Sequence, residues 1–327
     1  MKKYCIIFLI LLLFIFNLHS GSPADTVRPV IDRHQTIERL QDHLKALTLT
    51  IGDRSVFRPE NLEKTAKYIE SFYRDIGLPV WREPYQYQDL TVANLVSEIH
   101  FSAHPSKRYL LGAHYDSVLG TVGADDNASA IAVQLETARN LKALVDRENI
   151  DLAVKFVSFT LEEPPIFNTR YMGSRVYAQK ARKEKENIDG MICLEMVGYA
   201  CHSPGCQSYP FPLMFFGYPK EGNFIGIVGN LGSLSFTRAL FQAFLKNPEL
   251  PVIKLTVPFG WWLMPAVRLS DHSSFWDQGF KAVMITDSAF YRNPHYHRPS
   301  DTMEKLDYHF MSNLVESLLI FFSSHRR

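Results

Sequence analysis

The distribution of apolar and polar residues along the chain predicts helices that alternate with strands. Six segments have apolar residues at helical spacing, whereas shorter, nearly continuous apolar runs are typical of strands buried on both faces. The helical segments are residues 30–49, 59–76, 127–144, 174–183, 234–245 and 311–323. The strand segments are residues 90–101, 109–114, 152–160, 190–196 and 281–286. This order predicts an α/β fold whose mixed, mostly parallel sheet is covered by helices on both faces.

The N-terminal segment, residues 1–24, has a different pattern. Two lysines precede an apolar run over residues 4–18, and small residues follow up to Ala24. A basic start, a short apolar middle and a small-residue end are typical of a secretory signal peptide. The run is shorter than the roughly 18 to 20 residues that span a bilayer, which disfavours an uncleaved anchor. We expect a periplasmic or secreted protein with one domain over residues 25–327 and no stable membrane insertion after cleavage.

Composition limits the classes of partner. The 327 residues are 46% hydrophobic and carry a formal net charge of +1. This charge gives no electrostatic reason to expect nucleic acid or an anionic membrane surface as the partner. The length is sufficient for one large domain with a sizeable core. A binding protein without catalytic activity is also compatible with this composition.

The cysteines agree with export. Cys201 and Cys206 flank the turn-forming sequence HSPG, and a bridge between them would suit an oxidising compartment. The alternative is two free thiols. Cys193 lies in an apolar run and is expected in the core. A zinc site built from these cysteines is disfavoured because no fourth ligand lies at a structural-zinc spacing.

Acidic residues and histidines follow several of the predicted strands. His114, Glu162, Glu163 and Glu195 lie at or just after strand ends, and Asp126 begins the next helix. Open α/β sheets bind ligands outside the carboxyl ends of their strands, so these side chains are expected to converge. Imidazole and carboxylate groups without thiolates suit Zn²⁺, Mn²⁺ or Co²⁺, and two such ions need a bridging carboxylate. Each residue alone could instead be structural.

Neighbouring acids suggest further roles. Asp116 lies two positions after His114, so both side chains would face one side of a strand and Asp116 could orient the imidazole. Glu162 and Glu163 are adjacent, so their side chains diverge. One of them could bind a metal ion while the other acts as the general base on the attacking water.

Seven fragments, in this order, resemble the M28 family of zinc-dependent exopeptidases. The fragments are GAHYDS, GADDNASA, SFTLEE, GSRVYA, LEMVGY, SDHSSFW and NPHYHRPSDT, and the resemblance covers about residues 90–308. It implies the zinc-exopeptidase (phosphorylase/hydrolase-like) fold, in which a mixed, mostly parallel sheet lies between helices. It also implies a metallopeptidase with two zinc ions and peptide substrates, most often an aminopeptidase.

The resemblance implies five metal ligands. Asp126 would bridge the two zinc ions. His114 and Glu195 would complete the protein ligands of one ion, and Glu163 and His297 would complete those of the other. Glutamate at position 195 is a departure, because many aminopeptidases of this family have aspartate there.

The resemblance also implies three catalytic roles. Glu162 would be the general base, Asp116 would orient the first histidine ligand, and Tyr296 would stabilise the oxyanion. The peptide bond Asp126–Asn127 would be cis, as in several family members. Asp271 and His272 are interpreted as scaffold. An apolar specificity wall made by Phe259, Trp261 and Trp262 is an alternative to ordinary packing.

Two other functions stay open. One is a glutaminyl-peptide cyclotransferase with a single zinc ion, a related branch that shares the fold. Against it, Tyr296 stands where such cyclases commonly have tryptophan, and GADDNAS is more similar to the two-metal peptidases. The other is a peptidase-like binding domain without activity, although such relatives usually lose ligands and none is missing here.

Overall fold

The computed structural model describes residues 31–145, 147–210, 214–257 and 264–326. An eight-stranded sheet forms its centre, in the order β1-β2-β4-β3-β5-β8-β6-β7. Its strands are β1 Val80–Tyr87, β2 Leu90–His100, β3 Lys107–His114, β4 Leu152–Phe159, β5 Gly190–Glu195, β6 Ile225–Asn230, β7 Val252–Val257 and β8 Ala282–Thr286. Four of the seven pairings are parallel, so the predicted mixed, mostly parallel sheet is confirmed.

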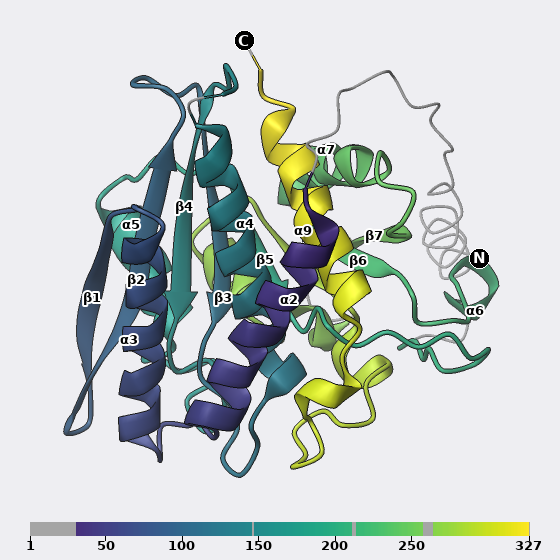
Figure 1. Ribbon diagram of the computed structural model, residues 1–327, viewed down its shortest axis with the longest axis horizontal. Coiled ribbons are helices and arrows are strands. Elements are labelled where there is room, and N and C mark those ends of the chain that lie inside the picture. Colours follow the sequence, from purple (N-terminus) through teal and green to yellow (C-terminus); the bar gives the residue numbers. More distant parts are fainter. Residues whose placement is uncertain (1–30, 146, 211–213, 258–263, 327) are drawn as a thin grey trace, which may run out of the picture.

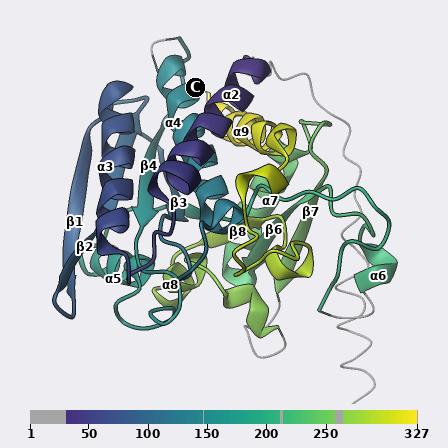
Figure 2. The ribbon, with the colours of Figure 1, turned by 60° about the horizontal axis from the view of Figure 1, so that its bottom comes forward.

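Helices cover both faces of this sheet, as Figures 1 and 2 show. The helices on one face pack their apolar residues against the sheet and form the largest core cluster with it. These helices are α2 Arg33–Leu44, α3 Pro59–Asp75, α4 Ala130–Leu144, α7 Leu234–Phe244 and α9 Tyr308–Ser323. The opposite face is covered by α5 Gly173–Lys183 and α8 His272–Asp277, which form a second cluster with strand residues. The short helix α6 Met214–Gly217 lies near β6 and β7 with a smaller cluster. The two-layer covering explains why the central strands are almost entirely apolar.

The structure contains three strands and two short helices, α6 and α8, that the pattern of apolar residues did not predict. Strand β1 is an edge strand that contains Pro84 and is only partly buried, which is where a sheet tolerates proline. Strand β6 contains Gly226 and Gly229, and a Cβ atom at Gly229 would lie 2.2 Å from Thr237 Oγ1 of α7. The glycine is therefore required by close packing of helix on sheet, although it weakens the strand pattern. Strand β7 is the other edge, and helix α8 has only six residues.

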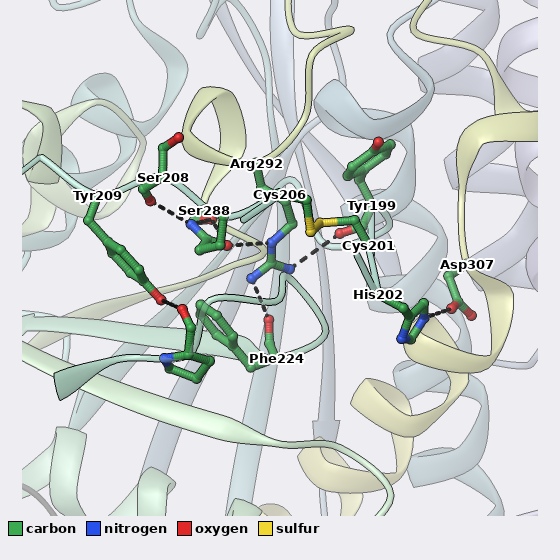
Figure 3. The surroundings of a disulfide bond; sticks show 12 residues. Tyr199, Cys201, His202, Cys206, Ser208, Tyr209, Phe224, Ser288, Arg292 and Asp307 are labelled. Atoms are coloured by element: carbon green, nitrogen blue, oxygen red, sulfur yellow. Dashed lines mark hydrogen bonds and ion pairs between the residues drawn. A yellow bond between two sulfur atoms is a disulfide. The ribbon is translucent and has the colours of Figure 1, made fainter. Parts of the chain in front are cut away.

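The predicted bridge between Cys201 and Cys206 is present, and Cys193 is buried as a free thiol, as expected. Figure 3 shows that the bridged loop lies beside Arg292, whose guanidinium donates hydrogen bonds to Gln207 Oε1, Tyr199 O and Phe224 O. These bonds join the segment after β5 to the loop after β8. The expected signal peptide lies outside the described residues. Within the described part of the chain, no helix combines the length and apolar character that a membrane crossing needs.

Candidate metal centre

Three neighbouring parallel strands bring most of the candidate residues together. Strand β3 ends at His114 and lies between β4 and β5 in the sheet. Glu162 and Glu163 follow β4, and Glu195 is the last residue of β5. Because the carboxyl ends of parallel strands meet at one edge, the four side chains converge there, as the sequence predicted.

Asp126 and His297 reach the same edge from loops. Asp126 lies in the turn Ala124–Ser129, directly before α4, where its own backbone is not helical, and its peptide bond to Asn127 is cis, as the resemblance implied. The Asn127 side chain donates to Leu194 O and accepts from Met196 N, which joins this turn to the end of β5. His297 lies in the loop between β8 and α9 and is partly exposed.

The donor atoms form two groups that share Asp126. In the first group, His114 Nε2 lies 3.4 Å from Asp126 Oδ1 and 3.4 Å from Glu195 Oε2. In the second group, His297 Nε2 lies 3.2 Å from Asp126 Oδ2 and 3.3 Å from Glu163 Oε2. Zinc bonds of about 2.0–2.1 Å at tetrahedral angles separate ligand atoms by about 3.3 Å. Both groups therefore have the spacing of zinc ligands, and one oxygen of Asp126 faces each position.

Unpaired polar atoms support a cation at these positions. His114 Nε2, which faces the first position, and Glu163 Oε1 are buried and have no hydrogen-bond partner among the described residues. Such atoms are costly unless a partner is bound. Ligand atoms of His114, Asp126 and Glu163 lie within 4.8 Å of one another, as do those of His114, Glu162 and Glu195. The residues present therefore fit a bound divalent cation.

The centre carries an excess of buried acids. Burial and the neighbouring carboxylates raise the pKa of Glu162 well above its usual range and that of Glu163 to about 8. Burial alone would lower the pKa of His114, but the carboxylates of Glu162 and Glu195 outweigh it and raise the pKa well above its usual value. These upward shifts share a cause, which is several negative groups held in one buried space. Divalent cations would neutralise this charge.

Asp116 holds the segment that carries both glutamates. Its Oδ1 accepts a hydrogen bond from Glu162 N at 3.1 Å, and its Oδ2 accepts one from Glu163 N at 3.0 Å. Asp116 Oδ1 also lies 3.4 Å from His114 Nδ1. The structure thus places Asp116 beside the imidazole and adds the two backbone contacts.

The sequence interpretation overlooked Asp301 and Arg54. Asp301 accepts hydrogen bonds from Asp125 N at 3.0 Å and from Asp126 N at 3.1 Å, one on each oxygen. Arg54 is fully buried and donates to backbone oxygens of the segments that carry Asp116 and Asp126, including Tyr115 O and Gly123 O. Burial lowers the pKa of Arg54 to about 10, although Asp116 and Asp301 oppose the shift. No local pattern identifies either residue, because the contacts that join them to the centre span 61 positions for Tyr115 O and 176 for Asp125 N.

Asp125 has more contacts than a turn residue needs. Its Oδ1 accepts from Gly198 N at 2.9 Å, and its Oδ2 accepts from Asn293 Nδ2 at 2.7 Å. It therefore joins the loops after β5 and β8 to the turn before α4. The interpretation of Asp125 as a simple turn or cap residue was incomplete, because these partners are far away in the sequence.

Tyr296 and the pair Asp271–His272 lie next to the centre. The Tyr296 ring stacks on the His297 ring with centroids 3.8 Å apart, and burial raises the pKa of its phenol. The phenol is therefore protonated and able to donate a hydrogen bond. Burial lowers the pKa of His272 to about 4, and its Nε2 lies 2.7 Å from Val267 O, in agreement with a scaffold role. The suggested wall of Phe259, Trp261 and Trp262 lies outside the described residues.

Comparisons with known proteins agree with this geometry. The chain is 34% identical to the uncharacterized protein YfbL of Escherichia coli K12, and the match covers 98% of both chains. It is 26% identical to a probable zinc metalloprotease of Pyrenophora tritici-repentis over 61% of this chain, and it spans 42% of that relative's length.

Solved structures share the fold. The LapA aminopeptidase of Legionella pneumophila has a TM-score of 0.66 at 17% identity, covering 93% of this chain and 78% of that one. The glutaminyl cyclase of Macrostomum lignano has a TM-score of 0.68 at 18% identity, covering 96% and 98%. The model of peptidase family M28 matches residues 94–211 and 257–321, more than half of the sequence. The chain belongs to peptidase family M28.

Proposed function

We propose that this protein is an exported aminopeptidase that binds two zinc ions and uses Glu162 as its general base. One observation carries the proposal: the two oxygens of Asp126 face His114 and His297 at 3.4 and 3.2 Å. A carboxylate so placed between two groups of donors is what a pair of co-catalytic ions requires. His114 and Glu195 would hold one ion, and Glu163 and His297 the other.

When bound, the ions would polarise the scissile carbonyl and lower the pKa of water. Glu162 Oε2 lies 3.8 Å from His114 Nε2, farther than the proposed ligand oxygens, so it is left free to act on water. Its carboxylate would accept the proton of the attacking water and pass it to the leaving amine nitrogen as the C–N bond breaks. The Tyr296 hydroxyl would donate a hydrogen bond to the carbonyl oxygen as negative charge develops there. Asp116 would keep both His114 and the Glu162 backbone in place.

Export is part of the proposal. The bridge between Cys201 and Cys206 supports an oxidising compartment, because such bonds are rare in proteins of the reducing cytosol. The composition of residues 1–24, with two lysines before a short apolar run, supports their role as a cleaved signal peptide.

Replacement of Glu162 by Gln tests the mechanism. The amide has the same shape but cannot accept the proton, so hydrolysis of aminoacyl substrates should fall about 10²- to 10⁴-fold. Zinc content, measured by atomic emission on the purified protein, should stay at two per chain. The exposed Glu60→Gln variant serves as the matched control and should keep full activity. Hydrolysis near the wild-type rate in Glu162→Gln would refute the assignment of the base.

A specific observation supports the cyclase alternative. A glutaminyl cyclase and an aminopeptidase share the fold of this chain at similar TM-scores, 0.68 and 0.66. Ammonia release from peptides with N-terminal glutamine, compared with amine release from aminoacyl substrates, separates the two activities. Ammonia release with one zinc ion per chain would replace the aminopeptidase proposal. Peptide binding without turnover of either substrate would instead indicate a binding domain.

A further inference from the structure

The disulfide-bridged segment after β5 packs against the loop that carries His297. We call residues 199–208 the bridged segment and residues 287–301 the histidine loop. Hydrogen bonds join the two segments: Ser208 N to Tyr291 O at 2.7 Å, Gln207 Nε2 to Ser288 Oγ at 2.9 Å, and Tyr199 N to Asp287 Oδ2 at 2.9 Å. These contacts lie outside the set of proposed metal ligands.

Arg292 lies at the centre of this contact and is only 5% exposed. Its Nε donates to Gln207 Oε1 at 2.8 Å, its Nη2 to Phe224 O at 2.9 Å and its Nη1 to Tyr199 O at 3.3 Å (Figure 3). Its guanidinium carbon also lies 4.5 Å from the centroid of the Phe224 ring. A buried guanidinium needs partners for its donors, and its planar shape allows them in few orientations. Arg292 therefore attaches the histidine loop to the bridged segment and to the residue before β6.

The attachment at Arg292 continues to the proposed ligand. The next residue, Asn293, donates from Nδ2 to Asp125 Oδ2 at 2.7 Å and accepts at Oδ1 from His295 N at 2.8 Å. His297 follows with a left-handed backbone at φ 55°, and two more non-glycine residues of the loop have positive φ. Such a backbone is unfavourable for a residue with a side chain and persists only when its surroundings hold it. The position of the imidazole therefore depends on contacts between the loop and its neighbours.

The bridge lies next to a residue that Arg292 contacts. Cys201 and Cys206 are only partly buried, and the four residues between them are exposed. Gln207, directly after the bridge, is buried. A disulfide removes conformational freedom from the residues that it joins. The bridge therefore limits the movement of Gln207, which an exposed segment without a bridge would hold less firmly.

The ligands of the first metal position are held in another way. His114 and Glu195 are the last residues of β3 and β5. Residues 196–198, which separate Glu195 from the bridged segment, donate backbone hydrogen bonds to side chains of the turn before α4. Movement of the bridged segment should thus affect the second metal position and leave the first position intact.

We propose that Arg292 is a positioning residue that holds the histidine loop at the second metal position, and that it needs the bridge between Cys201 and Cys206 to do so. This inference rests on the proposed role of His297 as a zinc ligand. A dithiol opens such a bridge: the sulfur–sulfur bond takes up two electrons and two protons to give two thiols, and the dithiol becomes a disulfide. The metal centre would therefore be complete only in a compartment that keeps the bridge closed.

Hydrogen exchange of the metal-free protein tests this contact without zinc. Peptides that cover the histidine loop would be followed by mass spectrometry with the bridge closed and after its reduction by a dithiol. The backbone amides of the loop should exchange about 10-fold faster after reduction, because a weakened hydrogen bond to the guanidinium favours local opening. Peptides of strand β3 should be unchanged. Equal exchange of the histidine loop in both states would overturn the proposal.

Zinc affinity measures the consequence at the metal centre. Dissociation constants would be determined by competition with a fluorescent chelator for the Arg292→Met variant and for a protein with both Cys201→Ser and Cys206→Ser. Each should bind one of the two zinc ions about 10- to 100-fold more weakly, as is typical when a group that orients a metal ligand is removed. The control Ser203→Ala changes an exposed residue inside the same bridge and should keep the wild-type affinities. An equal loss at both ions would overturn the proposal, because it would indicate a general effect on the fold.

Two variants of Gln207 cover a failure of these proteins to fold. Gln207→Leu removes the oxygen that accepts from Arg292 Nε, so the same zinc ion should bind more weakly. Gln207→Glu keeps an oxygen acceptor at this place and should retain most of the affinity. Equal zinc affinities in the two variants would overturn the role of this contact.

A second background shows whether the bridge acts through His297. In a His297→Ala protein, the further changes Cys201→Ser and Cys206→Ser should leave zinc affinity unaltered, because the ligand that the loop carries is gone. A further loss would overturn the proposal. Failure of the wild-type protein to bind zinc would refute the proposed function itself, whereas the exchange of the histidine loop would still decide whether the bridge holds that loop.

Discussion

At the scale of single residues, two aspartates support the centre without facing the proposed ions. Asp116 and Asp301 each use both oxygens to accept hydrogen bonds from two consecutive backbone N–H groups. Three of these N–H groups belong to Asp126, Glu162 and Glu163. Each aspartate therefore fixes the main chain at a position where a short loop would otherwise be free to move. The candidate ligands are held in place through their backbone as well as their side chains.

Replacement of Asp301 by Ala should destabilise the protein by about 2–6 kcal/mol, because two buried N–H groups lose their acceptors at about 1–3 kcal/mol each. The free energy of unfolding, measured with urea, checks this value. Asp301→Asn keeps one oxygen acceptor and should lose less. The control is Ser300→Ala, which removes an exposed hydroxyl bonded to the partly buried His295 ring. A loss in Asp301→Ala no larger than that of the control would show that water replaces the carboxylate.

At the scale of elements, the edge strand β1 is tied to helix α3 by a charged cluster. Arg82 of β1 donates to Glu63 at 2.8 and 3.1 Å and to Glu70 at 2.9 Å through two nitrogens. Hydrogen bonding to Arg82 lowers the pKa of both glutamates. Among the strands that the structure describes, β1 pairs only with β2, so these bonds add a second attachment for an edge element.

The Arg82→Met variant should be destabilised by about 1–2 kcal/mol at pH 7, because the partly exposed cluster is screened by solvent. The glutamates have lowered pKa values in the folded state. Their stabilising effect is therefore complete above the usual glutamate pKa and is lost as the pH falls through the folded-state values. The difference between wild type and variant should shrink below about pH 4. Urea unfolding from pH 3 to pH 8 measures it, and a difference that is constant with pH would contradict the role of charge. Lys64→Met, on the same helix, is the control.

The helices and strands also show how much of the fold could be predicted from the sequence. Strands β3, β4 and β5 are mostly apolar runs, and the candidate ligands at their ends follow from that pattern. Strand β1 contains Pro84 and β6 contains two glycines, so local pattern argued against both, and only pairing with neighbours makes them strands. Asp301 could not be assigned, because its contacts with Asp125 and Asp126 join segments 175 or more positions apart. The residue types that could bind a metal ion can be recognised in the sequence, whereas the groups that hold these residues in place depend on the complete fold.

At the scale of the whole molecule, the centre lies where many separate segments meet. The ends of β3, β4 and β5, the turn before α4 and the loop after β8 each contribute at least one candidate ligand. Buried acids that repel one another hold these segments together only if a cation compensates their charge. Metal binding should therefore be coupled to the stability of the whole fold.

Removal of metal should lower the melting temperature by several degrees, because an ion present at about 1,000 times its dissociation constant stabilises the folded state by roughly 4 kcal/mol. Calorimetry with a chelator, and again after addition of zinc, measures the shift and its reversal. The shift should decrease at acidic pH, since the ligands must lose protons to bind zinc. His297→Ala removes a proposed ligand and should reduce the shift, whereas His309→Ala, an exposed residue of α9, should leave it unchanged. The prediction would be contradicted if the melting temperature of the wild type did not respond to chelator, or if the shift were equal in both histidine variants. Either result would show that the stability of this fold does not depend on the proposed metal centre.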